Sequence, residues 1–361
     1  MKDAQLPENV ELLRTRVVIE KDRVFSVSGS DYPNQYPGIG NGFDIEEFKK
    51  TFKVKIQRLS KHSVEFDLIG IDASIANAFR RIMIAEVPTM AIEKVYVMNN
   101  TSIIQDEVVA HRLGLIPIKA DPLEFDYMTE DGGPTDLNTL VFKLKKKCEF
   151  NPDAAADETD PNKKYINSFE EEINDDKLLV YSGDLVWEPK GNQEEKFGDN
   201  PPRPVHDDIV IAKLRPGQEM EMELHCQKGL GREHAKWSPV ATASYRILPE
   251  ITILEPITGE DAEEFKKCFV DGVVEVVMEN GVKTAKVVNA RKDTVSREVL
   301  RHDKFIDKVR LTRVRDHFIF NVETSGIIPA EQIFISALDV FMDKIKDIQP
   351  LVDLVVSNEL N

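Results

Sequence analysis

The sequence lacks the features that mark secreted, disulfide-linked and membrane-spanning chains. It has only three cysteines in 361 residues, Cys148, Cys226 and Cys268, which form no CxxC pair, so it predicts neither a disulfide framework nor a cysteine-rich zinc site. It has no uncharged apolar run of about 18 residues. Its start, Met1–Glu20, lacks the basic and then apolar pattern of a secretory leader. We therefore expect an intracellular protein that has no membrane partner.

Positive charge is also scarce. Lys and Arg number 47 against 64 Asp and Glu, which gives a net charge of −17. Binding of a phosphate backbone by bulk charge requires a basic footprint, so the chain as a whole is not expected to bind nucleic acid in this way. Its 41% apolar and 31% charged residues fit an ordinary core beneath a solvated or partner-covered surface. The length allows about two domains.

Apolar periodicity predicts a hairpin near the start of the chain. Residues 1–50 end in a stretch rich in Gly and Pro, which predicts an N-terminal extension. Alternating apolar residues on both sides of a polar turn then predict a β-hairpin over Phe52–Leu68.

The next segment changes to a helical period over Ser74–Glu86, with Asp72 or Ser74 as the cap and Pro88 as the stop. Four apolar residues lie on one arc of this helix and two arginines lie on the opposite side. The apolar residues are Ile75, Phe79, Ile82 and Met83, and the arginines are Arg80 and Arg81.

The middle of the chain is predicted to be mostly β-structure. We expect a strand pair over Val95–Ile104 that turns at Asn99–Asn100, a helix over Asp106–Leu113, and a hairpin over Asp208–Cys226. Between them, residues 153–176 contain nine acidic residues and two lysines, which predicts a solvated acidic loop.

A strand and a helix are predicted near the end of the chain. The strand includes Phe318–Val322, and Pro329 opens the helix. Pro350 is expected to end this helix. Apolar residues repeat along it at spacings of 3 and 4, a seam that packs on another helix. These residues are Phe334, Leu338, Phe341, Ile345 and Ile348.

Motifs for chemistry are weak. The Gly229–Gly231 turn lacks the third glycine of a dinucleotide loop, and His225, Cys226 and His234 lack zinc-like spacing. No serine or cysteine lies in a recognisable nucleophile elbow. We expect no catalytic, cofactor-binding or metal-binding residue; an enzyme that uses the glycine or His-Cys features remains an alternative.

The segment Ser296–His317 is locally basic, with seven Lys or Arg against four acidic residues. It could contact nucleic acid or an acidic partner, which leaves an independent nucleic-acid-binding protein as a second alternative. Aromatic stacking groups are not interleaved with the arginines, so a solvated sheet face is favoured.

Three blocks give the sequence its resemblance to a known family. They are Ile71–Pro88 (IDASIANAFRRIMIAEVP), His111–Ile118 (HRLGLIPI) and Gly229–Val240 (GLGREHAKWSPV). The first resembles the signature helix of the RNA polymerase α-subunit family, which includes the archaeal D subunit, and the other two resemble its archaeal and eukaryotic branch. The resemblance extends over roughly Phe52–Ile348.

Within that branch the sequence most resembles the larger α-like subunit shared by eukaryotic RNA polymerases I and III. The polymerase II counterpart carries a cysteine cluster after the HRLGLIPI block, whereas Ala120–Leu144 has no cysteine. The polymerase II-type subunit is kept as an alternative. Some archaeal relatives hold an iron-sulfur cluster in a ferredoxin-like insert, and Glu263–Arg301, with Cys268 alone, implies an insert without a cluster.

The resemblance implies an α+β fold built on a discontinuous dimerisation domain, an antiparallel sheet with two packed helices. This domain would comprise residues 51–90 and 241–348, with the cluster-free insert at about 258–301. A mostly β inserted domain would occupy 91–240, and 349–361 would be a C-terminal tail.

The resemblance also implies the partners. The two apolar faces would meet those of a small α-like subunit in a four-helix core, and Arg80 and Arg81 would contact the second-largest subunit. The protein would be a non-catalytic scaffold for rRNA, 5S rRNA and tRNA transcription in the nucleus, including the nucleolus. Its relation to DNA would be only indirect, through the complex.

Overall fold

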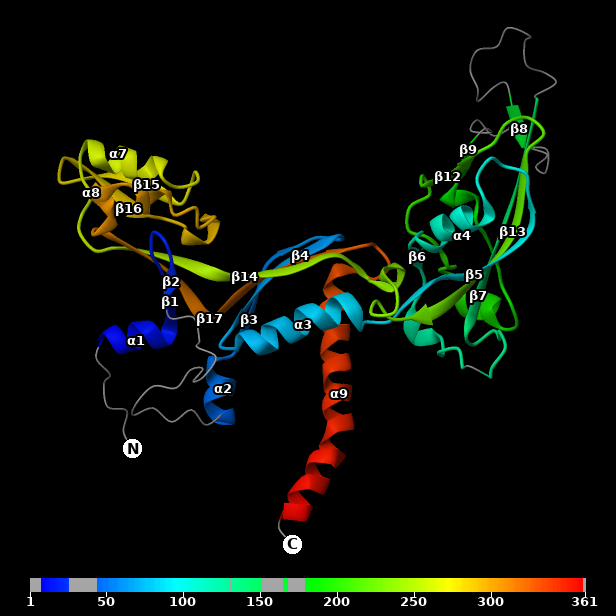
Figure 1. Cartoon of the computed structure of the whole chain (residues 1–361), viewed down its shortest axis with the longest axis horizontal. Coiled ribbons are helices and arrows are strands. Elements are labelled where there is room, and N and C mark those ends of the chain that lie inside the picture. The colour runs from blue at the N-terminus through cyan, green and yellow to red at the C-terminus, as the bar shows by residue number, and fades with distance from the viewer. Residues whose placement is uncertain (1–7, 26–43, 130, 151–164, 168–178, 360–361) are drawn as a thin grey trace. The chain divides into compact units, whose positions relative to one another are not determined.

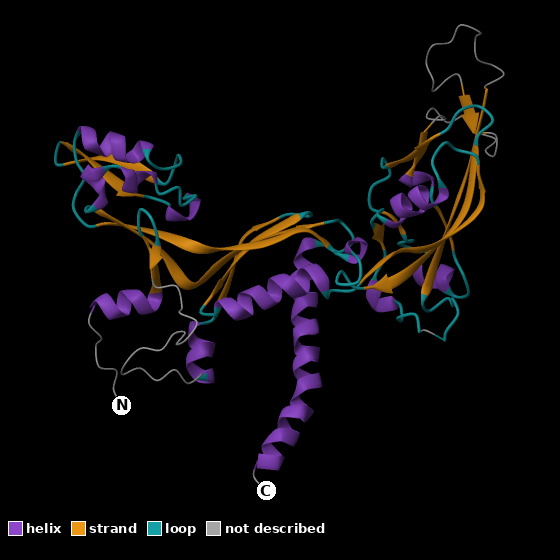
Figure 2. Cartoon of the chain, viewed as in Figure 1, coloured by secondary structure: helices purple, strands orange, loops and turns teal. Residues whose placement is uncertain are grey.

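The computed structural model describes residues 8–25, 44–129, 131–150, 165–167 and 179–359, and Figures 1 and 2 show the described elements. The chain divides into two compact units, each described by itself. The first comprises Met1–Arg58, Glu65–Ala78 and Ser244–Asn321, and the second comprises the remaining segments. No helix among the described residues combines the length and apolarity needed to cross a membrane.

A six-stranded sheet forms the first unit's framework. Its strand order is β2-β1-β17-β4-β3, and β14 also pairs with β17. The strands are β1 (Arg16–Ile19), β2 (Val24–Phe25), β3 (Lys53–Leu59), β4 (Ser63–Ile69), β14 (Val240–Ile253) and β17 (Val309–Thr324).

The predicted hairpin is confirmed as β3 and β4. Ser60 and Ser63 close its turn through backbone and hydroxyl hydrogen bonds. On β4 the aromatic ring of Phe66 stacks on Phe320 of β17, with centroids 5.2 Å apart. Gly70 follows β4 at φ +81°, and a Cβ there would lie 2.9 Å from the Thr51 backbone, so this junction requires glycine.

The N-terminal extension predicted over residues 1–50 is wrong for part of that range. Helix α1 (Glu8–Thr15) leads into β1, which pairs antiparallel with β17 and buries Ile19. The Arg16 guanidinium donates to both carboxylate oxygens of Glu250, at 2.6 and 3.2 Å. Helix α2 (Ile45–Thr51), capped by Asp44, precedes β3. β-branched Val17–Ile19 form a strand because the adjoining strand pairs with them, whereas the prediction rested on the Gly- and Pro-rich stretch that follows.

Residues between β14 and β17 form a small packed body in the same unit. Helix α7 packs on the antiparallel pair of β15 and β16, around the buried Phe265 and Phe305. Its elements are α7 (Glu260–Lys267), β15 (Val274–Glu279), β16 (Val282–Val287), the 3-10 turns η4 (Ala290–Lys292) and η5 (Glu298–Arg301), and α8 (Asp303–Ile306).

The second unit contains a five-stranded sheet in the order β10-β7-β13-β5, with β8 paired to β7. The side chains of Phe142, Leu224 and Leu113 form its core together with other aliphatic residues. The strands are β5 (Thr89–Asn100), β7 (Thr139–Phe150), β8 (Tyr165–Asn167), β10 (Val186–Glu188) and β13 (Glu219–Gly229).

Shorter elements surround this sheet. The predicted helix after residue 105 is confirmed as α4 (Asp106–Gly114), which buries Val109 and Leu113. Two small sheets pair β6 with β11 and β9 with β12. The remaining elements are β6 (Ile118–Lys119), η1 (Pro122–Glu124), β9 (Leu179–Tyr181), η2 (Ser182–Asp184), α6 (Gln193–Phe197), β11 (Arg203–Pro204), β12 (Val210–Lys213) and η3 (Ala235–Trp237).

Two predicted strand pairings in this unit are wrong. Asn99 and Asn100 continue β5 and pair with β13, while the segment after them bends instead of returning as a strand. The predicted hairpin over Asp208–Cys226 contains two strands, but β12 pairs with β9 whereas β13 pairs with β5 and β7. The period-2 pattern located the strands, and long-range partners decided their pairing. Most of the predicted acidic loop, residues 153–176, lies outside the described residues.

The C-terminal helix begins as predicted and ends later. Helix α9 spans Ala330–Glu359 and contains Pro350 in its interior, so the predictions of a helix end at Pro350 and of a separate tail at 349–361 are wrong. Proline removes one backbone donor and crowds the carbonyl four residues earlier, which disfavours a helix without always ending it.

Candidate dimerisation interface

From Phe79 onward, the apolar arc of α3 (Ala73–Ala85) packs on α9 within the second unit. The ring of Phe79 lies between two rings of α9, with centroids 5.3 Å from Phe334 and 5.3 Å from Phe341. Both contacts are edge-on, a geometry that adds about 0.5–1.5 kcal/mol per pair beyond burial. The two distant apolar faces predicted from the sequence therefore meet within one chain.

This packing divides the predicted interface residues into two groups. Ile82 and Met83 are only 3% and 0% exposed, and Phe79 is 7% exposed. In the isolated chain these three side chains are therefore buried, and their role in a heterodimer interface stays a prediction. Ile75, Phe334 and Phe341 are half-buried, whereas Leu338 and Ile345 are exposed.

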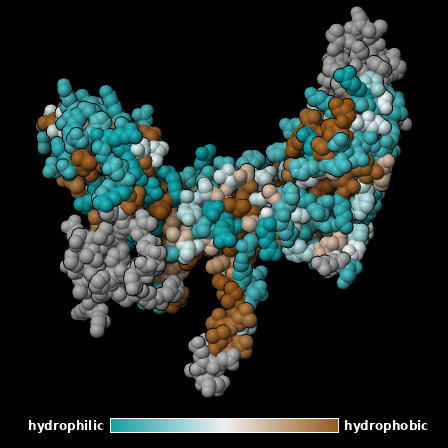
Figure 3. All heavy atoms as spheres, viewed as in Figure 1, coloured by the Kyte–Doolittle hydropathy of each residue, from teal (hydrophilic) through white to brown (hydrophobic). Residues whose placement is uncertain are grey.

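Helix α9 carries a long exposed apolar surface, which we call the α9 stripe. Figure 3 shows it as a hydrophobic band along the lower part of the helix. It extends over about 30 Å at 1.5 Å per residue. Its members are Ile335, Leu338, Met342, Ile345, Ile348, Leu351, Val352, Leu354 and Val355. Contiguous exposed apolar surfaces of this kind are typical of protein–protein or membrane contacts, ligand grooves or aggregation-prone regions.

Sequence reasoning missed the part of the stripe that follows Pro350. Val352 and Val355 continue the 3- and 4-residue spacing of Ile345 and Ile348, so the signal was present in the sequence. It was missed because Pro350 was interpreted as the end of the helix.

The C-terminal end of α3 is held by the block that contains the glycine turn. Arg232 N donates to Ala85 O at 2.9 Å, and a Cβ on Gly231 would lie 2.3 Å from Ile84 O. A Cβ on Gly229 would likewise meet the Trp237 ring at 2.4 Å. Both glycines allow close packing within the chain, which accounts for them without a phosphate-binding role.

The beginning of α9 is fixed in the same unit. Ser325 N donates to Pro239 O at 2.9 Å, and Gly326 adopts φ +90° to turn the chain into the helix. Further along, the Lys344 ammonium lies 2.5 Å from a Glu86 carboxylate oxygen just after α3. These contacts set how α9 crosses α3.

Arg80 and Arg81 lie on the other side of α3 from its buried arc. Arg80 is half-buried and Arg81 is exposed. Ile84, which lies between them on the helical wheel, is also half-buried. The structure thus leaves at least the Arg81 guanidinium available to a partner's carboxylate.

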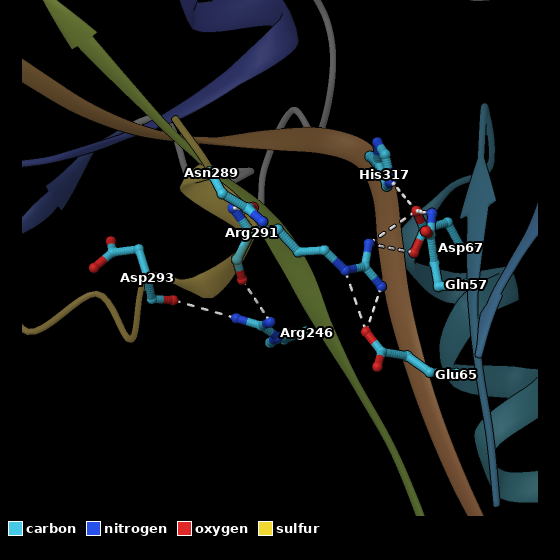
Figure 4. A network of polar contacts seen from close by, with 8 residues as sticks. All are labelled: Gln57, Glu65, Asp67, Arg246, Asn289, Arg291, Asp293 and His317. Carbon is cyan, nitrogen blue, oxygen red and sulfur yellow. Dashed lines mark hydrogen bonds and ion pairs between the residues drawn. The ribbon is translucent and has the colours of Figure 1, made fainter. Parts of the chain in front are cut away.

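A polar network fixes the small packed body between β14 and β17 to the sheet of the first unit (Figure 4). Arg291 of η4 donates to both oxygens of Asp67 at 2.7 and 2.9 Å, and to Glu65 at 2.5 and 3.2 Å. Arg246 of β14 donates to the backbone carbonyls of Arg291 and Asp293, at 2.6 and 3.2 Å. The backbone and the side chain of Arg291 are therefore both held.

Asp67 is the most buried member of this network, at 2% exposed. Burial alone would raise its pKa, but hydrogen bonds from Arg291, Gln57 and His317 outweigh burial and hold the pKa of Asp67 below its ordinary 3.8. Gln57 donates at 2.8 Å, and His317 Nε2 lies 3.2 Å from the carboxylate. Asp67 is therefore a buried anion stabilised by its partners.

The structure does not bring together the His-Cys features. His225 contacts Glu223 at 2.8 Å on one face of β13, while Cys226 is completely buried on the opposite face, where burial raises its pKa. His234 Nδ1 accepts from Lys236 N at 3.1 Å and caps η3. Within the described ranges, no group of three or more His, Cys, Asp or Glu could hold a metal ion.

The basic segment Ser296–His317 is partly neutralised within the chain. Lys304 pairs with Asp261 at 3.0 Å and with Glu264, and Arg301 pairs with Glu298 at 2.9 Å. The segment also spans a 3-10 turn, a short helix and part of β17, so its cations do not follow one element. This disfavours it as a nucleic-acid-binding surface.

Comparison with known proteins agrees with this geometry. The model of the RNA polymerase Rpb3/Rpb11 dimerisation domain matches residues 65–345. DNA-directed RNA polymerases I and III subunit RPAC1 of Bos taurus is 52% identical over 336 residues, 93% of this chain and 94% of the relative. The protein of the same name in Saccharomyces cerevisiae is 49% identical over 332 residues, 91% and 96% of the two chains.

A relative named for other polymerases is less similar. DNA-directed RNA polymerases II, IV and V subunit 3 of Arabidopsis thaliana is 32% identical over 328 residues, 88% of this chain and 96% of the relative. The family model covers most of the chain, from β4 to the middle of α9. The chain belongs to the RNA polymerase Rpb3/Rpb11 dimerisation-domain family.

Proposed function

We propose that this protein is a non-catalytic assembly subunit of DNA-directed RNA polymerases I and III. The observation that carries this proposal is the identity of about half of all residues, over more than nine-tenths of both chains, with relatives named as subunits of these two polymerases. Nucleotide addition would then occur in other subunits, and this chain would supply a platform in the nucleus, including the nucleolus. The two polymerases would transcribe rRNA, 5S rRNA and tRNA.

The polymerase II-type alternative has less support. The cited relative named for polymerases II, IV and V shares 32% identity, against 52% and 49% for the two relatives named for polymerases I and III. The absence of cysteine from Ala120–Leu144 agrees with the same choice.

We infer that the α9 stripe binds a small α-like subunit. Its members Leu338 and Ile345 are exposed, whereas Phe334 and Phe341 on the same helix are half-buried and pack on Phe79. Complete burial of one such aliphatic side chain contributes about 1.5–3 kcal/mol, so a partner helix along the stripe could form a stable pair. The partner would then need an apolar helix of comparable length.

We further infer that Arg80 and Arg81 contact the second-largest subunit. They lie opposite the arc that packs on α9, so this contact would use the side of α3 that faces away from α9, separate from the α9 stripe. A planar guanidinium suits bidentate contact with carboxylates, which gives the pair a specific role. Contact with DNA would be indirect.

The finer domain assignment is also a proposal. We infer that residues 51–90 and 241–348 form the discontinuous dimerisation domain, and that residues 91–240 are inserted in it. For the insert at about 258–301, α7, β15 and β16 supply one helix and two strands of the β-α-β-β-α-β ferredoxin-like pattern. We propose that the insert is a shortened form of that fold without a cluster.

Affinity purification of the tagged full-length chain tests the function. Leu338→Glu combined with Ile345→Glu places two charges on the exposed stripe and should remove the small subunit, because burial of unpaired charge is strongly unfavourable. Lys346→Glu, at an exposed position of α9 that is already charged, is the comparison variant and should retain it.

A second variant separates the two proposed contacts. Arg80→Glu with Arg81→Glu should retain the small subunit and lose the large subunits, as measured by quantitative mass spectrometry of the purified material. Retention of the large subunits at wild-type stoichiometry would refute the arginine assignment. Recovery of the wild-type chain without any polymerase subunit would refute the proposed function itself.

A further inference from the structure

Helix α2 and strand β3 form a strongly basic segment in an acidic protein. Residues 48–58 contain four lysines and one arginine and no acidic residue, although the whole chain carries −17. These cations are Lys49, Lys50, Lys53, Lys55 and Arg58, and all five are exposed. Lys49 pairs with Glu46 on the surface, but Lys53, Lys55 and Arg58 have no ion-pair partner in the part of the chain that the structure describes.

Strand β3 is also the edge of its sheet. The strand order ends at β3, and all seven of its residues are exposed, whereas the neighbouring β4 has four buried residues of seven. An edge strand presents a row of backbone N–H and C=O groups that can pair with another extended chain. We call Lys53–Arg58 the β3 edge.

The two faces of the β3 edge differ in chemistry. Gln57 donates to Asp67 at 2.8 Å, so Gln57, Lys55 and Lys53 lie on the Asp67 face of the sheet. Val54 and Ile56 lie on the opposite face and are 47% and 65% exposed. Lysine on an edge strand is a known protection against aggregation, which accounts for the cations but not for two exposed β-branched residues between them.

An extended acidic peptide fits both faces at once. Main-chain pairing would give hydrogen-bond partners to the backbone N–H and C=O groups of the edge. Carboxylates opposite Lys53 and Lys55 would form cross-strand ion pairs, and apolar residues of the peptide would cover Val54 and Ile56. Single-stranded nucleic acid fits less well, because its binding sites present aromatic stacking groups. Strand β3 has no aromatic residue, and Phe48 and Phe52 just before it are half-buried and stack on each other with centroids 5.2 Å apart.

We propose that the β3 edge docks an extended acidic segment of a companion polymerase subunit. This inference rests on the proposed function, because the partner is a member of the assembly. It adds a second contact surface, one based on strand pairing and charge, to the helical contact of the α9 stripe.

Photo-crosslinking within the assembled complex tests the proposal. The tagged full-length chain would carry p-benzoylphenylalanine in place of Ile56, and the complex would be irradiated after purification and analysed by mass spectrometry. The expected product joins residue 56 to a peptide of another subunit with acidic residues next to the crosslink. Lys53→Glu with Lys55→Glu should lower its yield at least about tenfold, because reversal of both cations opposes the partner's charge.

A control position tests the specificity of this crosslink. The same photo-reactive residue in place of Val186, 66% exposed on β10, should give no product with that peptide. A crosslink to nucleic acid, to this chain, or to a peptide without acidic residues would overturn the proposal, as would an unchanged yield in the double variant. If the preparation contains the large subunits but residue 56 forms no crosslink, only this inference is overturned. If the large subunits are absent from the preparation, the proposed function fails and this inference fails with it.

Discussion

The two halves of α9 have the same apolar spacing and opposite environments. Ala330, Ile333 and Ala337 in the first turns are at most 1% exposed, whereas every described side chain from Ile345 to Val355 is exposed. Apolar periodicity alone therefore identifies a helix face that is buried against another surface. It does not tell whether that surface belongs to the same chain or to a partner. In the first half the cover comes from this chain, notably through Phe79; in the second half we propose that it comes from a partner.

Phe79→Ala should produce the largest loss of fold stability. Removal of the ring between Phe334 and Phe341 should lower the free energy of unfolding by about 3–5 kcal/mol, because the cavity can collapse only partly. Ile348→Ala, in the exposed half, is the control and should change it by less than about 0.5 kcal/mol. Urea denaturation of the full chain measures both, and equal losses would contradict the difference between the two halves.

Arg291→Gln should produce the second-largest loss of fold stability. It leaves the buried Asp67 carboxylate without its main partner, which should cost about 3 kcal/mol in the first unit. Arg297→Gln, at a neighbouring basic position, is the comparison variant. If thermal denaturation shows the same small effect for both, the network of Figure 4 is not important for stability.

Gly231→Ala should destabilise the contact that holds the end of α3. The new methyl group would lie 2.3 Å from Ile84 O, and overpacking of this kind costs about 1–3 kcal/mol. Gly133→Ala is the matched control, because a Cβ there has no atom within 4 Å. A nucleotide-binding role for the turn would instead require measurable nucleotide binding that Gly231→Ala abolishes, and we expect none.

The ion pair of Asp67 with Arg291 should also make the stability of the fold depend on pH in the acidic range. Because the folded-state pKa of Asp67 is lower than its ordinary 3.8, its contribution is complete above 3.8 and is lost as pH falls through the folded value. Between about pH 5 and pH 3 the wild type should therefore lose more stability than Asp67→Asn. Parallel pH profiles for the two proteins would show that the carboxylate does not carry this contribution.

Pro350→Ala should have the smallest effect on the fold. Residues after Pro350 have no buried side chain among those described, so the free energy of unfolding should change by less than about 0.5 kcal/mol. Helix content should rise, because proline disfavours a helix interior by about 3 kcal/mol relative to alanine. Circular dichroism of the free chain measures this, and a large loss of stability would mean that the proline shapes the core.

Local pattern predicted the elements better than their partners. The β3–β4 hairpin, α3, α4 and the start of α9 follow from alternation, helical period and capping residues, and they are confirmed. The pairings of β12 and β13 and the entry of β1 into the sheet depend on strands far away in the sequence, which no local window contains.

The candidate site was predicted in the same uneven way. Its eight apolar residues were found from periodicity and resemblance, but Ile82 and Met83 proved to be internal because burial depends on how the chain closes on itself. The extension of the stripe beyond Pro350 was missed because a single residue preference was given more weight than the continuing apolar spacing. The basic β3 edge was present as a run of lysines, and only the strand order showed that it lies at an edge.

Amide hydrogen exchange of residues 345–359 is the most direct test of the claim that α9 is covered by a partner. The exchange would be compared between the isolated full-length chain and the purified polymerase. We expect at least about 100-fold slower exchange in the assembled state, because packing of the stripe removes local opening of the helix. Equal exchange rates in the two states would contradict it.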